Sequence, residues 1–232
     1  MKQKTNWGKY AMEFISIFIA VIAAFALNNW GENSRDHKAA TKILTEIGNG
    51  LQKDLDDINI NMYGHEQGIK ACKYWRRILD QEEVDYDSLF RYYIGVTRDF
   101  FILQNNSGYE TLKSKGLELL ENDSLRFDII SLYEYDYRAL KIMEEEYHAM
   151  QFEENYFKDF NAIIAPHLQF NKRGEVVGID TPIEIDADEK KLLLSYLRKI
   201  QFDRAFILRS YKETKQKVQD IAERIAQEIE GG

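Results

Sequence analysis

Cysteine, proline and histidine are scarce in this chain of 232 residues. The lone cysteine, Cys72, excludes an internal disulfide, and the only two prolines, Pro166 and Pro182, leave long stretches free to form helices. The pair Glu145 and His148 matches half of a helical di-iron motif. None of the other three histidines follows a glutamate at that spacing, so we predict no metal site.

An excess of basic charge is also lacking, since 31 lysines and arginines face 39 aspartates and glutamates. The first thirty residues hold three lysines and one glutamate, which leaves the rest with 28 basic and 38 acidic residues, a net charge of −10. Binding of nucleic acid needs a basic footprint, so we expect no nucleic-acid partner. The sequence also lacks a phosphate-cradling glycine loop, a nucleophile elbow and zinc-ligand spacing. We therefore predict no catalytic or cofactor-binding residues and no enzyme activity.

One apolar run near the amino terminus is close to the length that a membrane-spanning helix needs. Between Phe14 and Leu27 the only polar interruption is Ser16. About 20 residues cross the ~30 Å hydrocarbon layer of a bilayer as a helix. Trp7 and Trp30 flank the run in the manner of an aromatic belt at the two membrane interfaces. We predict a single transmembrane helix over residues 10–30, with the lipid bilayer as its partner.

The flanking charges bear on orientation. Three lysines precede the run and three basic residues follow it closely, but the leading segment has no acid and long following domains translocate largely regardless of charge. We predict a short cytoplasmic tail over residues 1–9, a place in the inner (cytoplasmic) membrane, and a periplasmic domain over residues 31–232. A cleaved signal peptide is the alternative, because Ala24-Phe25-Ala26 fits a small-x-small site. Glu13, at a position where a signal sequence should be uninterrupted, and Trp30 after the run favour an anchor.

Glu13, Ser16, Ala20 and Ala24 fall on one face of the predicted anchor. Small residues at this spacing let two helices approach closely, and a carboxylate within a membrane faces a partner helix or a wet pore. The alternative places Glu13 at the inner interface, where it reaches water and is favoured by the helix dipole. The first interpretation predicts that anchors associate through this face.

Beyond the anchor, apolar residues recur at steps of three and four, which indicates helices. These stripes include His65 and Arg204. We predict an all-α fold, in which the transmembrane helix is followed by an elongated antiparallel bundle of three long helices of similar length. We expect the short helices of residues 88–116 at the end distant from the membrane. The loop of residues 165–187, with a small hairpin, is expected near the bilayer.

Ser107 to Gly116 read as one short helix. Ser107 is predicted to occupy the cap position, Glu110 three residues later completes a capping box, and Gly116 ends the helix. With an exposed Lys113, this makes a rigid corner. One interpretation is purely structural. The other is a docking corner at the far end of the bundle, formed by Ser107, Tyr109, Glu110 and Lys113.

Two motifs carry a resemblance to a known family. The first is Asn28-Asn29-Trp30-Gly31-Glu32-Asn33, and the second is Ser107–Gly116, with Tyr109-Glu110-Thr111-Leu112-Lys113-Ser114 at its centre, followed by Leu125-Arg126 and Tyr133-Glu134. Over most of its first 140 residues the chain resembles a bacterial family of single-pass membrane proteins classed as a domain of unknown function. The resemblance implies a membrane location and an extracytoplasmic helical domain, and it implies no activity or catalytic residues.

Taken together, these features predict a membrane-anchored scaffold or interaction protein that associates with itself or joins a cell-envelope complex. The alternative is a sensor-like ligand-binding bundle that signals through a partner. An enclosed polar pocket between the long helices favours the sensor. A continuous apolar surface favours the scaffold.

Overall fold

The computed structural model describes residues 7–231, with side chains described from residue 11, and confirms the all-α class. The α-helices are α1 (Trp7–Leu79), α2 (Leu89–Gly95), α3 (Ser107–Lys115), α4 (Asp123–Ser131), α5 (Tyr137–Lys141), α6 (Lys158–Ile164) and α7 (Ala187–Gly231). Three π-helical turns are η3 (Leu132–Asp136), η4 (Ile142–Glu146) and η6 (Glu153–Phe157). The 3-10 turns are η1 (Tyr86–Ser88), η2 (Leu117–Leu119), η5 (His148–Met150) and η7 (Ala165–His167), and the strands are β1 (Leu168–Phe170) and β2 (Val176–Ile179).

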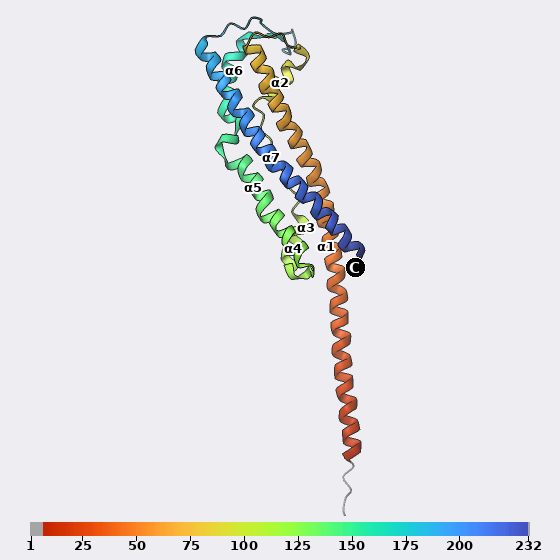
Figure 1. The fold of residues 1–232 in the computed structure, drawn as a ribbon. Helices are drawn as coiled ribbons and strands as arrows, with labels where there is room; N and C mark the ends of the chain where they lie inside the picture. Colours follow the sequence, from red (N-terminus) through yellow and green to blue (C-terminus); the bar gives the residue numbers. More distant parts are fainter. Residues whose placement is uncertain (1–6, 232) are drawn as a thin grey trace, which may run out of the picture.

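The predicted anchor and the first bundle helix form one uninterrupted helix, α1, of 73 residues. At ~1.5 Å per residue it is about 110 Å long. Residues 11–30 are exposed, and this part of α1 is long and apolar enough to cross a membrane. Along α1, the first buried apolar side chains are those of Ile43 and Leu44. Figure 1 shows α1 projecting from the bundle as a stalk, so we name the two ends of the bundle the stalk end and the far end.

Helix α7 lies antiparallel along α1 for its whole length (Figure 1). Lys190 forms an ion pair of 3.0 Å with Asp80 at the far end, and Ile225 lies against Gly48 near the stalk end. The helix begins at Ala187, because the Asp186 carboxylate accepts the N–H groups of the second and third residues of α7, each at 2.8 Å.

The elements α4 to α6 form a third layer that runs parallel to α1. Tyr137 in α5 meets Asp54, while Phe160 in α6 packs on Trp75 much farther along α1. The prediction that the second long helix returns toward the membrane is therefore wrong, and so is the position of the 165–187 loop. That loop lies at the far end, where Gln81 bonds the backbone of Ile183. Its predicted hairpin is confirmed, since β1 and β2 pair antiparallel.

The elements α4 to α6 run parallel to α1 because of residues 96–106, an extended segment that we call the strap. It carries the chain from the far end back toward the stalk end inside the bundle, so that Phe100 lies at Gly64 and Asn105 at Gly50 of α1. The predicted short helices are consequently divided. Helix α2 lies at the far end, whereas α3 packs on the stalk-end half of α1, with Gly108 against Ile47.

The second of the three predicted long helices, which lies before the 165–187 loop, is broken. Each π turn adds one residue to the repeat, and the chain leaves the helix at Tyr147, whose ψ is 102°. The N–H of Tyr147 bonds the carbonyl oxygen of Ile142, five residues back. This shift in phase turns Glu144 into the core, where 3% of its surface is exposed.

Buried apolar residues form two cores rather than one. The stalk-end core includes Leu51 and Ile58 of α1, and the far-end core begins at Ala71 of the same helix. Between them lies a band of buried polar side chains, which we call the polar band. It consists of Asp54, Asn61, His65, Glu144 and Arg204.

The contact between α3 and α1 gives a testable expectation. A Cβ atom at Gly108 would lie 2.8 Å from the backbone nitrogen of Ile47, and a backbone atom cannot move aside cheaply. We expect Gly108→Ala to lower the free energy of unfolding by about 2 kcal/mol, measured by denaturation of the full-length protein in detergent. Gly95→Ala is the control, since nothing lies within 4 Å of its added methyl group. Equal effects of the two changes would contradict the described crossing.

Candidate functional site

The predicted anchor residues lie on the exposed part of α1. Ser16 donates to the carbonyl oxygen of Glu13 at 2.9 Å, and Ala20 and Ala24 continue the same face. Trp30 is 73% exposed, while the side chain of Trp7 lies outside the described residues, as does most of the predicted tail of residues 1–9. The face is available for association, and association itself remains a prediction.

The predicted capping box at the corner is wrong. Asn106 occupies the cap position of α3, and Ser107 is its first helical residue, because the strap enters the helix with Asn106 already in helical geometry. Glu110 forms an ion pair with Lys113 at 3.3 Å instead of reaching back to the cap. Gly116 ends the helix as predicted, with a φ of 108° that glycine tolerates best.

The corner is also not at the far end, and it is fastened to the bundle. Tyr109 is buried, stacks on Tyr133 with ring centres 4.4 Å apart, and donates to Glu134 at 2.9 Å. Lys113 pairs with the same carboxylate at 3.1 Å. The hydrogen bond from Tyr109, and then the contact with Lys113, hold the pKa of Glu134 below its ordinary value. These contacts support the structural interpretation of the corner.

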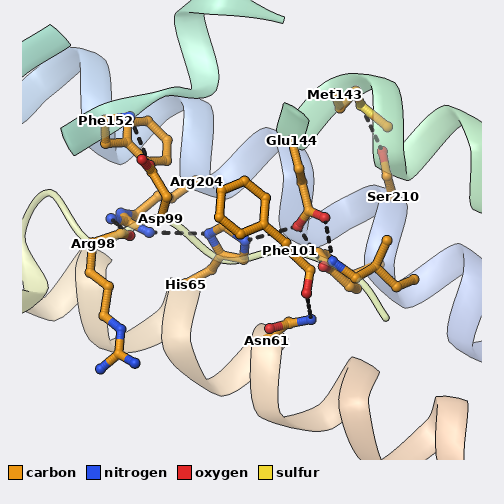
Figure 2. A network of polar contacts seen from close by, with 12 residues as sticks. Asn61, His65, Arg98, Asp99, Phe101, Met143, Glu144, Phe152, Arg204 and Ser210 are labelled. Carbon is orange, nitrogen blue, oxygen red and sulfur yellow. Dashed lines mark hydrogen bonds and ion pairs between the residues drawn. The ribbon is translucent and has the colours of Figure 1, made fainter. Parts of the chain in front are cut away.

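The strongest concentration of buried polar contacts is where the strap crosses the polar band. An extended segment has no helical partners for its backbone groups, so other residues must supply them. From α1, the Asp57 carboxylate accepts the N–H of Leu103 and the Asp54 carboxylate that of Asn105, both at 2.8 Å. The Asn61 amide donates to the carbonyl oxygen of Phe101 at 3.0 Å (Figure 2).

Glu144 holds the strap from the opposite side. Its carboxylate accepts the N–H of Ile102 at 2.8 Å and the hydroxyl proton of Tyr211 from α7. Burial dominates the electrostatics and raises the pKa of Glu144 to about 7, although both hydrogen bonds favour the charged form. This raised pKa stabilises the fold below the ordinary carboxyl value of 4.5, and the contribution is lost as the pH rises through about 7.

Arg204, on α7, holds the first residues of the strap, at its far-end side. It is fully buried, and one terminal nitrogen donates to the carbonyl oxygens of Val96 at 3.1 Å and Arg98 at 2.8 Å. The guanidinium also lies over the ring of Phe152, 4.3 Å from its centre. Burial lowers its pKa to about 10, so it stays charged at neutral pH. Glycine is needed at position 68, because a Cβ atom there would overlap Arg204.

His65 lies between the guanidinium group of Arg204 and the carboxyl group of Glu144. The other terminal nitrogen of Arg204 lies 3.2 Å from Nδ1 of His65, and because Arg204 can only donate, Nδ1 must accept. The proton of the neutral ring therefore sits on Nε2, which faces an oxygen of Glu144 at 3.7 Å (Figure 2). Burial, and secondarily the charge of Arg204, lower the pKa of His65 to about 3. The ring is thus neutral near pH 7.

The strap also organises the broken helix. The Asp99 carboxylate accepts the N–H of Phe152 at 2.8 Å and that of Glu153 at 3.3 Å, where the chain re-enters helix. The hydroxyl of Thr97 donates to Glu153 at 2.8 Å. Burial raises the pKa of Asp99, whose charge these backbone bonds favour. Side chains of the strap therefore also hold the broken helix in place, with Asp99 as acceptor and Thr97 as donor.

Sequence reasoning found some of these residues without their role. His65 and Arg204 stood on the apolar stripes, and a charged residue at a core position was the available signal. Glu144 sits in a run of three acids that resembles a solvated helix face, so only the π turn reveals it. The bonds from Asp54 and Asp57 to the strap could not be read from α1 alone.

The side chains of the polar band hold the backbone of the strap. Within residues 7–231, the polar atoms of the band largely bond one another and the strap, and no cluster of possible metal ligands is present. Two clefts lie at the two ends of the bundle. A cleft of about 470 Å³ opens at the stalk end between Ala40, Leu120 and Glu228, and another of about 570 Å³ lies beside Thr181 at the far end.

Comparison of the chain with protein-family models, with curated proteins and with solved structures finds no match. The resemblance carried by the anchor motif and by the motif around Tyr109 therefore remains a prediction.

Arg204 gives the second testable expectation. Lysine keeps the charge but cannot place planar donors on two carbonyl oxygens and an imidazole at once. We expect Arg204→Lys to lower the free energy of unfolding by about 2 to 4 kcal/mol, because buried acceptors lose their partners. Thermal or chemical denaturation in detergent measures this. Arg209→Lys, on the exposed face of the same helix, should change stability by less than about 0.5 kcal/mol. Similar losses for the two variants would refute the assigned role.

Proposed function

We propose that this chain is a membrane-anchored interaction protein that associates with copies of itself. In this proposal residues 10–30 cross the inner membrane, the amino terminus is cytoplasmic, and the bundle stands in the periplasm. The long apolar stretch of α1 supports the anchoring. The unbroken passage of α1 from that stretch into the bundle supports a fixed height and orientation above the membrane.

The observation that carries the proposal is the apolar surface that the strap presents. Phe101 is 48% exposed and Leu103 is 71% exposed, while Ile102 between them points into the core. Ile60, 65% exposed, lies on α1 between the two residues that bond the strap, Asp57 and Asn61. We call Ile60, Phe101 and Leu103 the strap surface. Exposed apolar side chains gathered in this way are typical of interaction sites.

The rigidity of the strap supports the same interpretation. Its backbone is bonded to α1, α7 and the broken helix through buried side chains, so Phe101 and Leu103 are displayed in one orientation. Side chains that are already ordered lose little conformational entropy when a partner covers them. A second copy offers the same anchor and the same surface, so two copies in one membrane meet in matching orientation.

The sensor alternative draws less support from the geometry. A ligand-binding bundle needs an enclosed polar pocket between its long helices. In the described part of the chain, the polar band at that place bonds the strap, and the two clefts described above lie at the ends of the bundle. We therefore retain the interaction protein as the proposed function.

Two differently tagged full-length copies, expressed in the same membranes and solubilised gently, test this proposal. We expect one tag to recover the other copy. Changing Phe101→Ser and Leu103→Ser together should reduce recovery at least about tenfold, because each buried large apolar side chain contributes about 1.5 to 3 kcal/mol. Phe127→Ser is the matched control, since Phe127 is 70% exposed but lies on α4, away from the strap. Ala20→Leu tests the contribution of the anchor face.

Recovery that depends on Ala20 but is unchanged by the strap variant would place association in the anchor and contradict the strap surface. Absence of co-recovery for the unaltered protein, both in detergent and after chemical cross-linking in intact membranes, would contradict self-association altogether.

A further inference from the structure

One exposed side of α1 leads from the strap surface down to the stalk. Residues that recur in steps of three and four lie on one side of a helix, because a turn holds about 3.6 residues. The line of this kind that contains Ile60 and Tyr63 is exposed along the bundle and the upper stalk. Below Ile60 its basic members outnumber its acids, with Arg35, Lys38, Lys42 and Lys53 against Glu46 and Asp56. We call this line, together with the strap surface, the α1 face.

The outer side of α7 carries aromatic and acidic residues in a line of the same spacing. Phe202 and Phe206 are exposed on successive turns. Arg204, two residues before Phe206 and hence about 200° around the helix, points into the bundle, so the line lies on the outside. Toward the stalk end its acids outnumber its basic residues, with Glu213, Asp220 and Glu223 against Arg209. We call this line the α7 face.

Charged residues of the two faces lie at one level above the stalk. Ile225 lies against Gly48, and α1 and α7 run antiparallel, so residues equally far along from this contact are level (Figure 1). Lys53 follows Gly48 by five residues and Asp220 precedes Ile225 by five, which puts both about 7.5 Å above the contact. A basic group on the α1 face therefore has an acidic group on the α7 face at its own height.

Apolar residues of the two faces are level in the same way. Arg204 lies at Gly68. Phe206 is two residues nearer the stalk end than Arg204, and Tyr63 is five residues nearer it than Gly68, so the levels of the two rings differ by about 5 Å. Ile60 lies one turn below Tyr63. Aromatic side chains can bridge such a difference.

A common anchor limits which of these groups can meet. Copies that cross one membrane through α1 are related by rotation about the membrane normal, so only groups at one level come together. Two α1 faces would bring Lys53 to its own counterpart, and two α7 faces would bring Asp220 to its own, and like charges that face each other across an interface repel. An α1 face against an α7 face instead pairs Lys53 with Asp220 and Tyr63 with Phe206.

We propose that the α1 face of one copy, including the strap surface, docks on the α7 face of the next copy. This inference rests on the proposed self-association, and it names the surface on the second copy that covers Phe101 and Leu103. The contact is heterologous, because it joins two different faces. Each pair therefore leaves one α1 face and one α7 face free, to which further copies add.

Two uncharged, exposed residues allow the contact to be tested by cross-linking. Asn49 lies on the α1 face beside Gly48, and Gln227 lies on the α7 face two residues after Ile225, so the two are level to within about 5 Å. The native Cys72 is fully buried, and the unaltered chain is the control for its reactivity.

Full-length Asn49→Cys with one tag and full-length Gln227→Cys with another are expressed in the same membranes and treated with a short bis-maleimide. We expect these two copies to cross-link to each other, and we expect no cross-link when both copies carry Asn49→Cys. A chain that carries both changes should give a ladder of trimers and larger species, because a heterologous contact repeats.

Charge reversal gives a second, independent measurement. Lys53→Glu and Asp220→Lys should each lower co-recovery of the tagged copies about fivefold, because an exposed ion pair contributes up to about 1 kcal/mol and each change replaces it with a repulsion. Both changes in one chain should restore recovery, since the pair forms again with its signs exchanged. Lys172→Glu, in the exposed hairpin turn at the far end, is the matched control and should leave recovery unchanged.

The outcomes separate this inference from the function on which it rests. Cross-linking of Asn49→Cys to itself, with dimers as the largest species of the doubly changed chain, overturns the heterologous contact in favour of a two-fold one. Failure of Asn49→Cys to cross-link with Gln227→Cys, or failure of the double charge reversal to restore recovery, also overturns it. In each of these cases the unaltered copies still recover one another, and self-association stands. If the unaltered copies do not recover one another, self-association and this contact fall together.

Discussion

The structure depends on how an extended segment is accommodated inside a helical bundle. Backbone N–H and C=O groups that are buried without partners cost several kilocalories per mole between them, and helices have no ladder to offer. Here Arg204, Glu144, Asp57 and Asp54 supply the partners from three different elements. Each of these side chains is polar or charged in a place where an apolar residue would otherwise pack. The band that divides the two hydrophobic cores is a direct consequence.

The same constraint explains which parts of the fold could be predicted from the sequence. The anchor stretch, the Gly116 terminus and the hairpin all follow from local patterns, and the structure has them. The course of residues 96–106 does not, because their partners are side chains distant in sequence. Because local patterns do not reveal this course, the predicted direction of the second long helix and the predicted position of the 165–187 loop are both wrong.

The break in the second helix has a related cause. An acidic run at Glu144 to Glu146 resembles a solvated face, and only the extra residue in η4 brings Glu144 to the strap. The corner at Tyr109 is predicted as a short helix ended by glycine, and Gly116 does end it. Its entry is set by the strap, and the bond from Tyr109 to Glu134 fastens it to the bundle. Local sequence defines elements well, while long-range polar contacts decide their order in space.

Helix α1 links the contacts of the polar band to the apolar stretch that could cross a membrane. Asp54, Asp57, Asn61 and His65 lie on one face of a helix that continues without interruption into the apolar stretch. A change in the polar band therefore acts on the same rigid rod that we propose as the anchor. In this view the bundle is a platform whose exposed apolar residues, on the strap, are set by buried charges a few ångströms beneath them.

Limited trypsin digestion tests most directly whether the strap is held as described. Arg98 lies exposed on the strap, but its carbonyl oxygen accepts from Arg204, whereas Lys172 and Arg173 lie in the exposed turn of the hairpin. The account predicts that the folded chain is cut after Lys172 or Arg173 and resists cleavage after Arg98, and that Arg204→Met opens the Arg98 site. Cleavage after Arg98 in the unaltered protein, as fast as in the hairpin turn, would contradict it.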